Sequence, residues 1–284
     1  LYNPDLRGKP LAVTGDADER HGIVLAKNYP AKAYGIKTGD VIWEAKNKCP
    51  HLITIPADFK KYLRFSDMIT QIYARYTDLI EPFGIDEAWL DITSVKDSSG
   101  KKIADEIRNT ILRETGVTAS VGVSFNKIFA KLGSDLKKPD ATTIIDFGNY
   151  KQKIWGLPVS ELLYAGRVTA QKLYRRCIYT IGDLANTDVN LVKAWLGKCG
   201  QALHDFANGR DYSPVKKWGE GREIKSVGNS MTCYRDLTSN SEVKALIYVL
   251  AESVASRMKK QGLIAGKVAV HKKDSDLKSY TRQC

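Results

Sequence analysis

The feature that most restricts the fold of this chain is the segment GIDEAWLDIT (84–93), an apolar strand that opens with two adjacent carboxylates, Asp86 and Glu87. Neighbouring side chains on a regular strand point to opposite faces, so these two can serve one site only where the strand bends or begins. Gly84 permits such a bend. Two acids held together repel each other, and a divalent cation is the usual reason for keeping them close. A solvated hairpin turn is the commoner explanation of such a decapeptide taken alone.

The pattern around this segment predicts an α+β fold with helices packed on one face of a sheet. Alternation and β-branched residues predict strands at 10–15, 21–26, 84–93, 117–123 and 142–147. Apolar spacing of three and four predicts helices at 27–34, 58–80, 101–115 and 126–137. Beyond residue 147 the chain becomes helical with many Gly breaks. A polar, basic linker at 213–225 precedes a predicted strand (226–234), helix (243–261) and strand (264–272).

The charge balance points to an anionic partner, either nucleic acid or a membrane surface. Formal net charge is +12, and +7 of it falls in residues 213–284. No apolar run reaches the roughly 18 residues that a membrane helix needs. Five scattered cysteines without metal-ligand spacing indicate a reducing, cytoplasmic setting and small buried side chains. A bound metal should therefore be a hard cation held by oxygen atoms.

Two basic clusters could bind phosphate. On a helix, Lys127, Lys131, Ser134 and Lys138 follow at spacings of four, three and four, which forms a basic ridge along one face. A solvated lysine face explains the same spacing equally well. In the second cluster (25–39), tyrosine rings alternate with lysines, a mixture that can bind a nucleotide. Helix packing is the commoner use of such tyrosines.

A third basic segment, residues 160–187, predicts two short helices joined by a Gly-containing turn. Such a turn can aim backbone N–H groups at a DNA phosphate. Thr180 and Asp183 form a capping box for the next helix, to which we assign no function.

Taken in order, these motifs resemble the Y-family, or lesion-bypass, DNA polymerases, the group of DNA polymerase IV and the UmuC-like (ImpB/MucB/SamB) proteins. The resemblance covers nearly the whole chain, and five motifs in family order make it specific. Lys32, where many members have Arg, leans toward the UmuC-like branch. The matching motifs are NPDLRGKPLAV (3–13), NYPAKAYGIKTG (28–39), GIDEAWLDIT (84–93), VTASVGVSFNKIFAKLGSDLKKP (117–139) and LYAGRVTAQKL (163–173).

The resemblance implies a right-hand polymerase with an antiparallel-sheet palm, small fingers, a helical thumb with a helix–hairpin–helix, and a partial α/β little finger. The implied domains are fingers 5–57, palm 58–146, thumb 147–212, linker 213–225 and little finger 226–284. By motif position, Asp86 and Glu87 are the expected catalytic and metal-binding carboxylates. The expected nucleotide-binding residues are Tyr29, Lys32 and Lys138. The expected DNA-binding residues are Gly166, Arg167, Lys172 and Lys131.

The resemblance also implies two Mg²⁺ ions, primer-template DNA and deoxynucleoside triphosphates as partners, and synthesis past damaged bases in an SOS-type repair response. In the family the first catalytic Asp lies shortly before the Asn-Pro found here at 3–4. We therefore expect the third carboxylate to be missing, the printed chain to be nearly inactive, and the clamp-binding tail to lie beyond residue 284. The thumb turn normally has Gly at both ends, whereas Tyr164 occupies the first place here, which puts the tightness of this DNA contact in doubt.

Two other classes of protein remain open. A non-catalytic DNA-binding repair factor would explain the charge and the thumb turn, and Asp86→Ala would leave it unaffected. A nucleotidyl cyclase built on a similar palm would explain the acids and lysines. It would not need the thumb turn or the basic C-terminal region, and it should ignore primer-template DNA.

Overall fold

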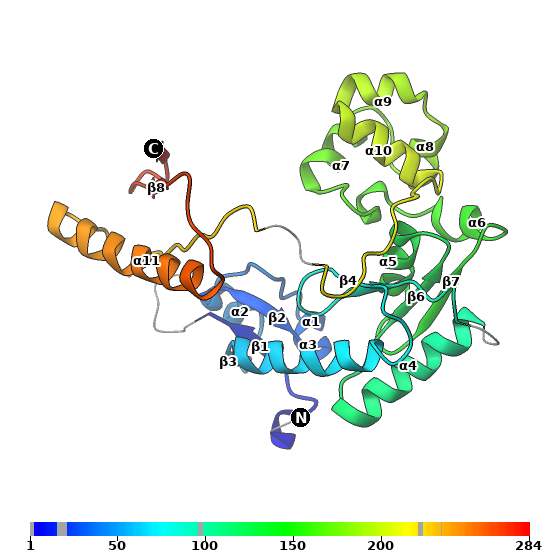
Figure 1. Cartoon of the computed structure of the whole chain (residues 1–284), viewed down its shortest axis with the longest axis horizontal. Coiled ribbons are helices and arrows are strands. Elements are labelled where there is room, and N and C mark those ends of the chain that lie inside the picture. The colour runs from blue at the N-terminus through cyan, green and yellow to red at the C-terminus, as the bar shows by residue number, and fades with distance from the viewer. Residues whose placement is uncertain (1–2, 16–21, 96–98, 221–223, 234) are drawn as a thin grey trace. The chain divides into compact units, whose positions relative to one another are not determined.

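The computed structural model of the chain describes residues 3–15, 22–95, 99–220, 224–233 and 235–284. These residues fall into two compact units, which are labelled by element in Figure 1. The first unit combines residues 1–58 with 222–284, and the second spans 59–221. The residues expected to form the palm and the thumb therefore share one unit. The borders between the five expected domains stay predictions.

The first unit contains a three-stranded sheet with the strand order β2-β1-β3. β1 (Leu11–Thr14) pairs antiparallel with β2 (Val24–Lys27) and parallel with β3 (Ile53–Pro56). A short 3-10 turn, η1 (Pro4–Leu6), precedes the sheet, and α1 (Tyr29–Ala33) and α2 (Ile42–Lys48) complete the fold around it. The two predicted strands are confirmed, while the acidic residues 16–19 between them, for which the sequence predicts a turn, lie outside the described residues. The core consists of Ala12, Val24, Ala31, Ile36, Ala45, Cys49 and Leu52.

The C-terminal part of this unit holds one long helix and one hairpin. α11 (Asn240–Lys260) begins three residues before the predicted start, because Ser239 and Glu242 form a capping box there. β8 (Ala269–Lys273) and β9 (Ser279–Gln283) pair antiparallel. The strand predicted at 226–234 is wrong: the described residues of that range form neither helix nor strand. The expectation of buried cysteines holds for Cys49 alone, since the other four, which are free thiols too, lie exposed or half-buried.

The second unit begins with α3 (Phe59–Tyr73), which packs on α4 (Gly100–Thr115) through buried isoleucines. Gly116 ends α4 with φ +72°, as predicted. The helix predicted at 58–80 ends at Tyr73 instead. The hydroxyl of Thr77 donates to the carbonyl of Asp91 (2.7 Å) and accepts from the N–H of Leu79 (3.1 Å). These bonds direct the chain into a strand, β4 (Ile80–Pro82), which pairs antiparallel with β5 (Ala88–Leu90).

A second pair of strands lies between two helices (Figure 1). β6 (Val121–Ser124) pairs with β7 (Thr142–Ile145), and the pair is parallel. Gly122 faces α5 (Lys127–Leu136), while the next residue, Val123, contacts Gly100 of α4. Successive residues of a strand point to opposite faces, so α4 and α5 cover opposite faces of this pair. The α+β class is confirmed. The antiparallel pairing expected in the palm holds for β4 and β5, whereas β6 and β7 pair parallel. The expectation of helices on one face only was wrong.

The remaining helices of this unit share one core with α5. That core buries Phe129 and Leu132 of α5, Ile145 of β7 and apolar residues of every later helix of the unit, which explains why residues 59–221 form one compact unit. The elements are α6 (Tyr150–Ile154), η2 (Val159–Glu161), α7 (Arg167–Tyr174), α8 (Ile181–Asn186), α9 (Val189–Leu196) and α10 (Lys198–Ala207). Across the part of the chain described here, no helix combines the length and apolar character needed to cross a bilayer.

Candidate active site

The two adjacent carboxylates lie on the hairpin between β4 and β5. The N–H of Phe83 donates to the carbonyl of Glu87 (2.8 Å), which closes a turn over residues 84–86. Gly84 takes φ +82°, a left-handed conformation that favours glycine. Asp86 is therefore exposed at the tip of the hairpin, and Glu87 is half-buried where β5 begins. The bend expected from Gly84 is confirmed, and it lets both acids stand at one end of the strand pair.

Helix α5 places lysines against these acids. Asn126 caps its start by accepting from the N–H of Phe129 (2.8 Å). One turn further, the ammonium of Lys131 lies 3.1 Å from Oε1 of Glu87 and 2.6 Å from Oδ2 of Asp135. Asp135 in turn pairs with Lys138 through its other oxygen at 2.7 Å. These ion pairs link acids and lysines alternately into one network, which we call the charge network of the site: Glu87, Lys131, Asp135 and Lys138.

Electrostatic interactions within this charge network favour the ionised forms of Lys131 and Asp135. Burial acts to lower the pKa of Lys131, but its hydrogen bonds to Asp135 and Glu87 outweigh burial, so the pKa is raised above its ordinary value. Burial acts in the opposite direction on Asp135, and Lys131 and Lys138 again outweigh it, so the pKa of Asp135 is lowered. The lysines of the predicted basic ridge are therefore neutralised one by one by acids. An incoming phosphate would have to compete with Asp135 for Lys138.

Beneath this surface lies a buried ion pair that the sequence did not reveal. Lys127, a member of the predicted basic ridge, turns inward to Oε2 of Glu81 at 3.0 Å. Its ammonium lies 5.3 Å from the centre of the Trp89 ring, and the Trp89 indole donates to the backbone carbonyl of Lys127 (2.9 Å). Glu81 and Trp89 are cross-strand partners of β4 and β5. The ion pair thus joins the carboxylate hairpin to the first turn of α5.

The same ion pair fixes the chain that follows α10. Lys127 donates to the carbonyl of Pro214 (3.1 Å), and Glu81 accepts from the N–H of Lys216 (3.1 Å). Further along, the ammonium of Lys217 pairs with Asp78 at 2.8 Å. The linker predicted at 213–225 is therefore held against β4 over its first residues. A carboxylate between two apolar residues of a strand, as in Ile80-Glu81-Pro82, was the available signal for a buried partner.

Tyr29 and Lys32, the expected nucleotide-binding residues of the first unit, are brought together on α1. Tyr29 opens this helix with an exposed ring, and the Lys32 ammonium lies 6.0 Å from the ring centre. Asn28 holds the start of the helix: its side-chain oxygen accepts from the N–H groups of Ala31 and Leu11, both at 3.1 Å. Sequence reasoning missed Asn28, although an Asn before a helical Tyr-Pro is a recognisable N-cap.

The expected DNA-contacting turn precedes α7. Its first flanking element is the 3-10 turn η2 rather than the helix predicted from the sequence. Tyr164, which replaces the first glycine of this turn, adopts φ +71°, a backbone conformation that favours glycine. Gly166 is the N-cap of α7 without any side-chain cap, and Arg167 and Lys172 lie exposed on that helix. The capping box of Thr180 and Asp183 is confirmed at α8.

The fit of a metal ion follows from the donors present. Nowhere in the described residues do three or more His, Cys, Asp or Glu side chains gather as a metal site. Asp86 and Glu87 supply two carboxylates at one hairpin tip, and hard cations prefer such oxygen donors. The donor type therefore fits Mg²⁺, and these two residues could hold it.

Comparison with known proteins assigns this geometry to a family. The model of the impB/mucB/samB family matches residues 1–135, and that of the family's C-terminal domain matches residues 224–284. A DNA polymerase IV from Acetivibrio thermocellus is 53% identical over 285 residues, covering 100% of this chain and 71% of the relative. The chain belongs to the impB/mucB/samB family of Y-family DNA polymerases. A second relative, DNA polymerase IV 1 from Bacillus subtilis, is 39% identical over 99% of this chain and 68% of its own length.

Solved Y-family structures agree with the assignment. The Y-family DNA polymerase chimera Dbh-Dpo4(243-245)-Dbh matches with a TM-score of 0.87 at 26% identity, covering 100% of this chain and 82% of its own. DinB from Sulfolobus solfataricus matches with a TM-score of 0.71, also at 26% identity. The right-hand polymerase fold and the enzyme class, DNA-directed DNA polymerase, are confirmed. A relative 53% identical over the whole chain is named DNA polymerase IV, which outweighs the UmuC-like lean drawn from Lys32 alone.

Proposed function

We propose that this Y-family chain synthesises DNA past damaged template bases in an SOS-type repair response, with Asp86 and Glu87 as its catalytic carboxylates. The observation that carries the proposal is the hairpin tip, where both acids meet and where Lys131 forms an ion pair with Glu87 in the charge network. Relatives named DNA polymerase IV support the type of reaction. Structures titled as ternary complexes of Dbh DNA polymerase support primer-template DNA and a nucleotide as substrates.

Asp86 and Glu87 would hold Mg²⁺. When bound, a pair of such ions activates the attacking 3′-oxygen and neutralises charge on the triphosphate. The protein's own part is to orient both carboxylates. Lys131 orients Glu87 from α5, and the turn at Gly84 keeps Asp86 exposed at the hairpin tip.

The remaining nucleotide-binding residues would neutralise the negative charge of the triphosphate. Lys138 would leave Asp135 to reach a phosphate, while Lys32 and the Tyr29 ring would bind phosphate and sugar. Gly166, Arg167 and Lys172 would contact DNA phosphates at the thumb turn. A DNA contact by Lys131 stays a prediction, because in this structure its ammonium lies between two carboxylates. A sliding clamp as a further partner also stays a prediction.

Primer extension with Mg²⁺ and deoxynucleotides, on undamaged and abasic templates, tests the proposal. Because only two carboxylates meet at the hairpin in the described residues, we propose that the printed chain extends weakly. It is compared with a version carrying the N-terminal strand of the Acetivibrio thermocellus relative. Extension that appears with the added strand and disappears in Asp86→Asn supports the proposal. DNA binding without extension in either version favours a non-catalytic binding factor.

A matched control separates catalysis from folding. Asp67 lies on α3, on an element without a proposed role in the site. Asp67→Asn removes the same charge as Asp86→Asn and should leave extension unchanged. Equal loss of extension in both variants would contradict a catalytic role for Asp86.

A further inference from the structure

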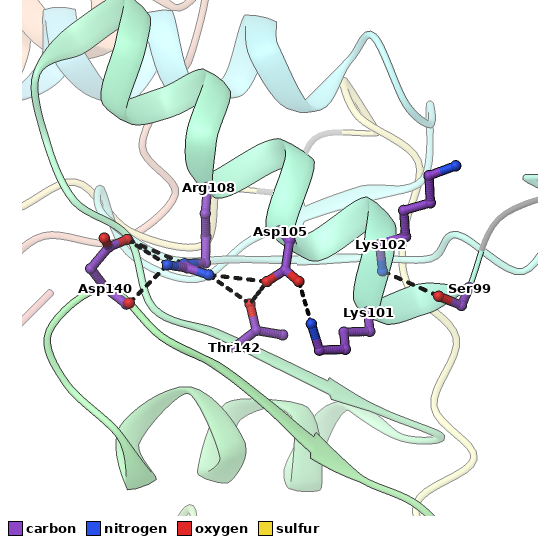
Figure 2. Close-up of polar contacts among 7 residues, drawn as sticks. All are labelled: Ser99, Lys101, Lys102, Asp105, Arg108, Asp140 and Thr142. Carbon is purple, nitrogen blue, oxygen red and sulfur yellow. Dashed lines mark hydrogen bonds and ion pairs between the residues drawn. The ribbon is translucent and has the colours of Figure 1, made fainter.

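The segment around Asp140 and Thr142, which follows Lys138 in the chain, is bonded to Arg108 of α4 (Figure 2). Arg108 of α4 reaches across to Asp140, two residues beyond Lys138. Its Nη2 donates to the backbone carbonyl of Asp140 (2.8 Å) and to Oδ1 of the same residue (2.9 Å), and Nε donates to that Oδ1 (3.2 Å). One guanidinium thus donates hydrogen bonds to both the backbone and the side chain of Asp140.

Arg108 is itself held in a fixed direction. Its Nη1 donates to Asp105 (3.0 Å) and to the hydroxyl of Thr142 (3.1 Å), and that hydroxyl donates to Asp105 (2.6 Å). Hydrogen bonds from Lys101 and Thr142 lower the pKa of Asp105, so it stays charged. The Arg108 side chain is only 14% exposed. Because a guanidinium is planar with donors in a rigid fork, these partners fix both its position and its orientation (Figure 2).

The hydrogen bonds of Arg108 stabilise an unusual backbone conformation in residues 138–140. Asp140 takes φ +52°, a conformation that few non-glycine residues adopt without support from their surroundings. Lys138 is 47% exposed, and among the described residues its ammonium forms an ion pair with Asp135 alone. Its long side chain is therefore located mainly by its backbone. In addition, the carboxylate of Asp140 would repel a triphosphate approaching Lys138, unless Arg108 neutralised it.

We propose that Arg108 is a positioning residue for the incoming nucleotide: by gripping Asp140 it places the backbone of Lys138 for triphosphate binding. This inference rests on the proposed role of Lys138. Arg108 touches neither substrate nor metal. Its effect passes through the turn at residues 138–140, and therefore concerns nucleotide affinity rather than DNA affinity.

Fluorescence anisotropy of a labelled deoxynucleoside triphosphate with Mg²⁺, added to the chain on primer-template DNA, tests the inference. Removing a charge-assisted anchor should weaken nucleotide binding about tenfold in Arg108→Ala, while DNA affinity stays within about twofold. Arg108→Lys keeps the charge but loses the fork and should recover only part of the affinity. The control is Arg75→Ala, which removes another two-bond guanidinium pair that also anchors to α4, at Glu114 (2.7 Å each).

A double-mutant cycle then identifies the route of the effect. If Arg108 acts through Lys138, adding Arg108→Ala to Lys138→Ala weakens nucleotide binding no further. Independent, multiplying losses would overturn the inference. Loss of nucleotide binding in Lys138→Ala but not in Arg108→Ala would overturn it too, while leaving the proposed function intact. No effect from either variant would overturn the inference together with the proposed role of Lys138.

Hydrogen exchange supplies a readout that needs no nucleotide. The peptide covering residues 136–142 should exchange faster in Arg108→Ala than in Arg75→Ala, with the other peptides of the second unit unchanged. Unchanged exchange in this peptide would show that Arg108 does not hold the turn, and would overturn the inference.

Discussion

The close approach of β6 to α5 at Gly122 predicts that Gly122→Ala disrupts the packing that supports the site. A Cβ at Gly122 would lie 1.9 Å from the carbonyl oxygen of Ala130 and 2.6 Å from the N–H nitrogen of Ser134. Both atoms belong to the backbone of α5, so no side chain can swing aside. Reaching 3.0 Å from the carbonyl oxygen means that α5 withdraws from β6 by about 1 Å, and a gap of that size forfeits a quarter to a half of the dispersion energy along the contact.

The expected cost is about 3 kcal/mol of unfolding free energy, at the upper end of the usual range for overpacking. A domain is typically stable by only about 5–15 kcal/mol. The same withdrawal would stretch the 3.1 Å contact of Lys131 with Glu87. Urea denaturation followed by circular dichroism measures the loss. The control is Gly156→Ala, because a Cβ there meets no atom within 4 Å; it should stay within about 0.5 kcal/mol of the parent. Equal midpoints for the two variants would refute the reasoning.

Three further predictions concern the buried pair and the thumb turn. Glu81→Gln leaves the Lys127 charge buried without its partner and should cost about 3–5 kcal/mol in urea denaturation; a cost below about 1 kcal/mol would contradict this. The folded pKa of Glu81 lies below its ordinary 4.5, so its stabilisation is complete above pH 4.5 and is lost as pH falls through the folded value. The parent should therefore lose stability more steeply than Glu81→Gln on going from pH 6 to 3. Tyr164→Gly relieves a left-handed backbone and should raise unfolding free energy by about 1 kcal/mol, with parallel thermal scans as the check.

Much of the fold was predictable because local signals agreed with tertiary packing. The capping box of Thr180 and Asp183 marked a helix start that the structure confirms, and the helix predicted at 101–115 ends at its predicted residue. The predictions failed where a distant group took over a local preference. Thr77 ended α3 early by bonding to Asp91, which lies 14 residues away. The residues 226–234, predicted as a strand, form no strand in their described part.

The candidate site was predictable in its residue types but not in its connections. Asp86, Glu87 and Lys138 were identified from motifs, and the bend at Gly84 from the strand period. Their electrostatic partners were not. Lys127 belonged by spacing to a solvated ridge, yet it turns inward to Glu81, 46 residues earlier in the chain.

By itself, the sequence determined the family, the adjacent carboxylates, most of the helices and the capping box of Thr180 and Asp183, because each depends on residues close together along the chain. Only the tertiary structure decided which acid neutralises which lysine, that α4 and α5 cover opposite faces of β6 and β7, and that Arg108 grips the turn of Lys138. The physical reason is that a charge is satisfied by whichever opposite charge the fold brings within about 3 Å. Spacing along one helix reports which side chains share a face, but not what lies opposite them.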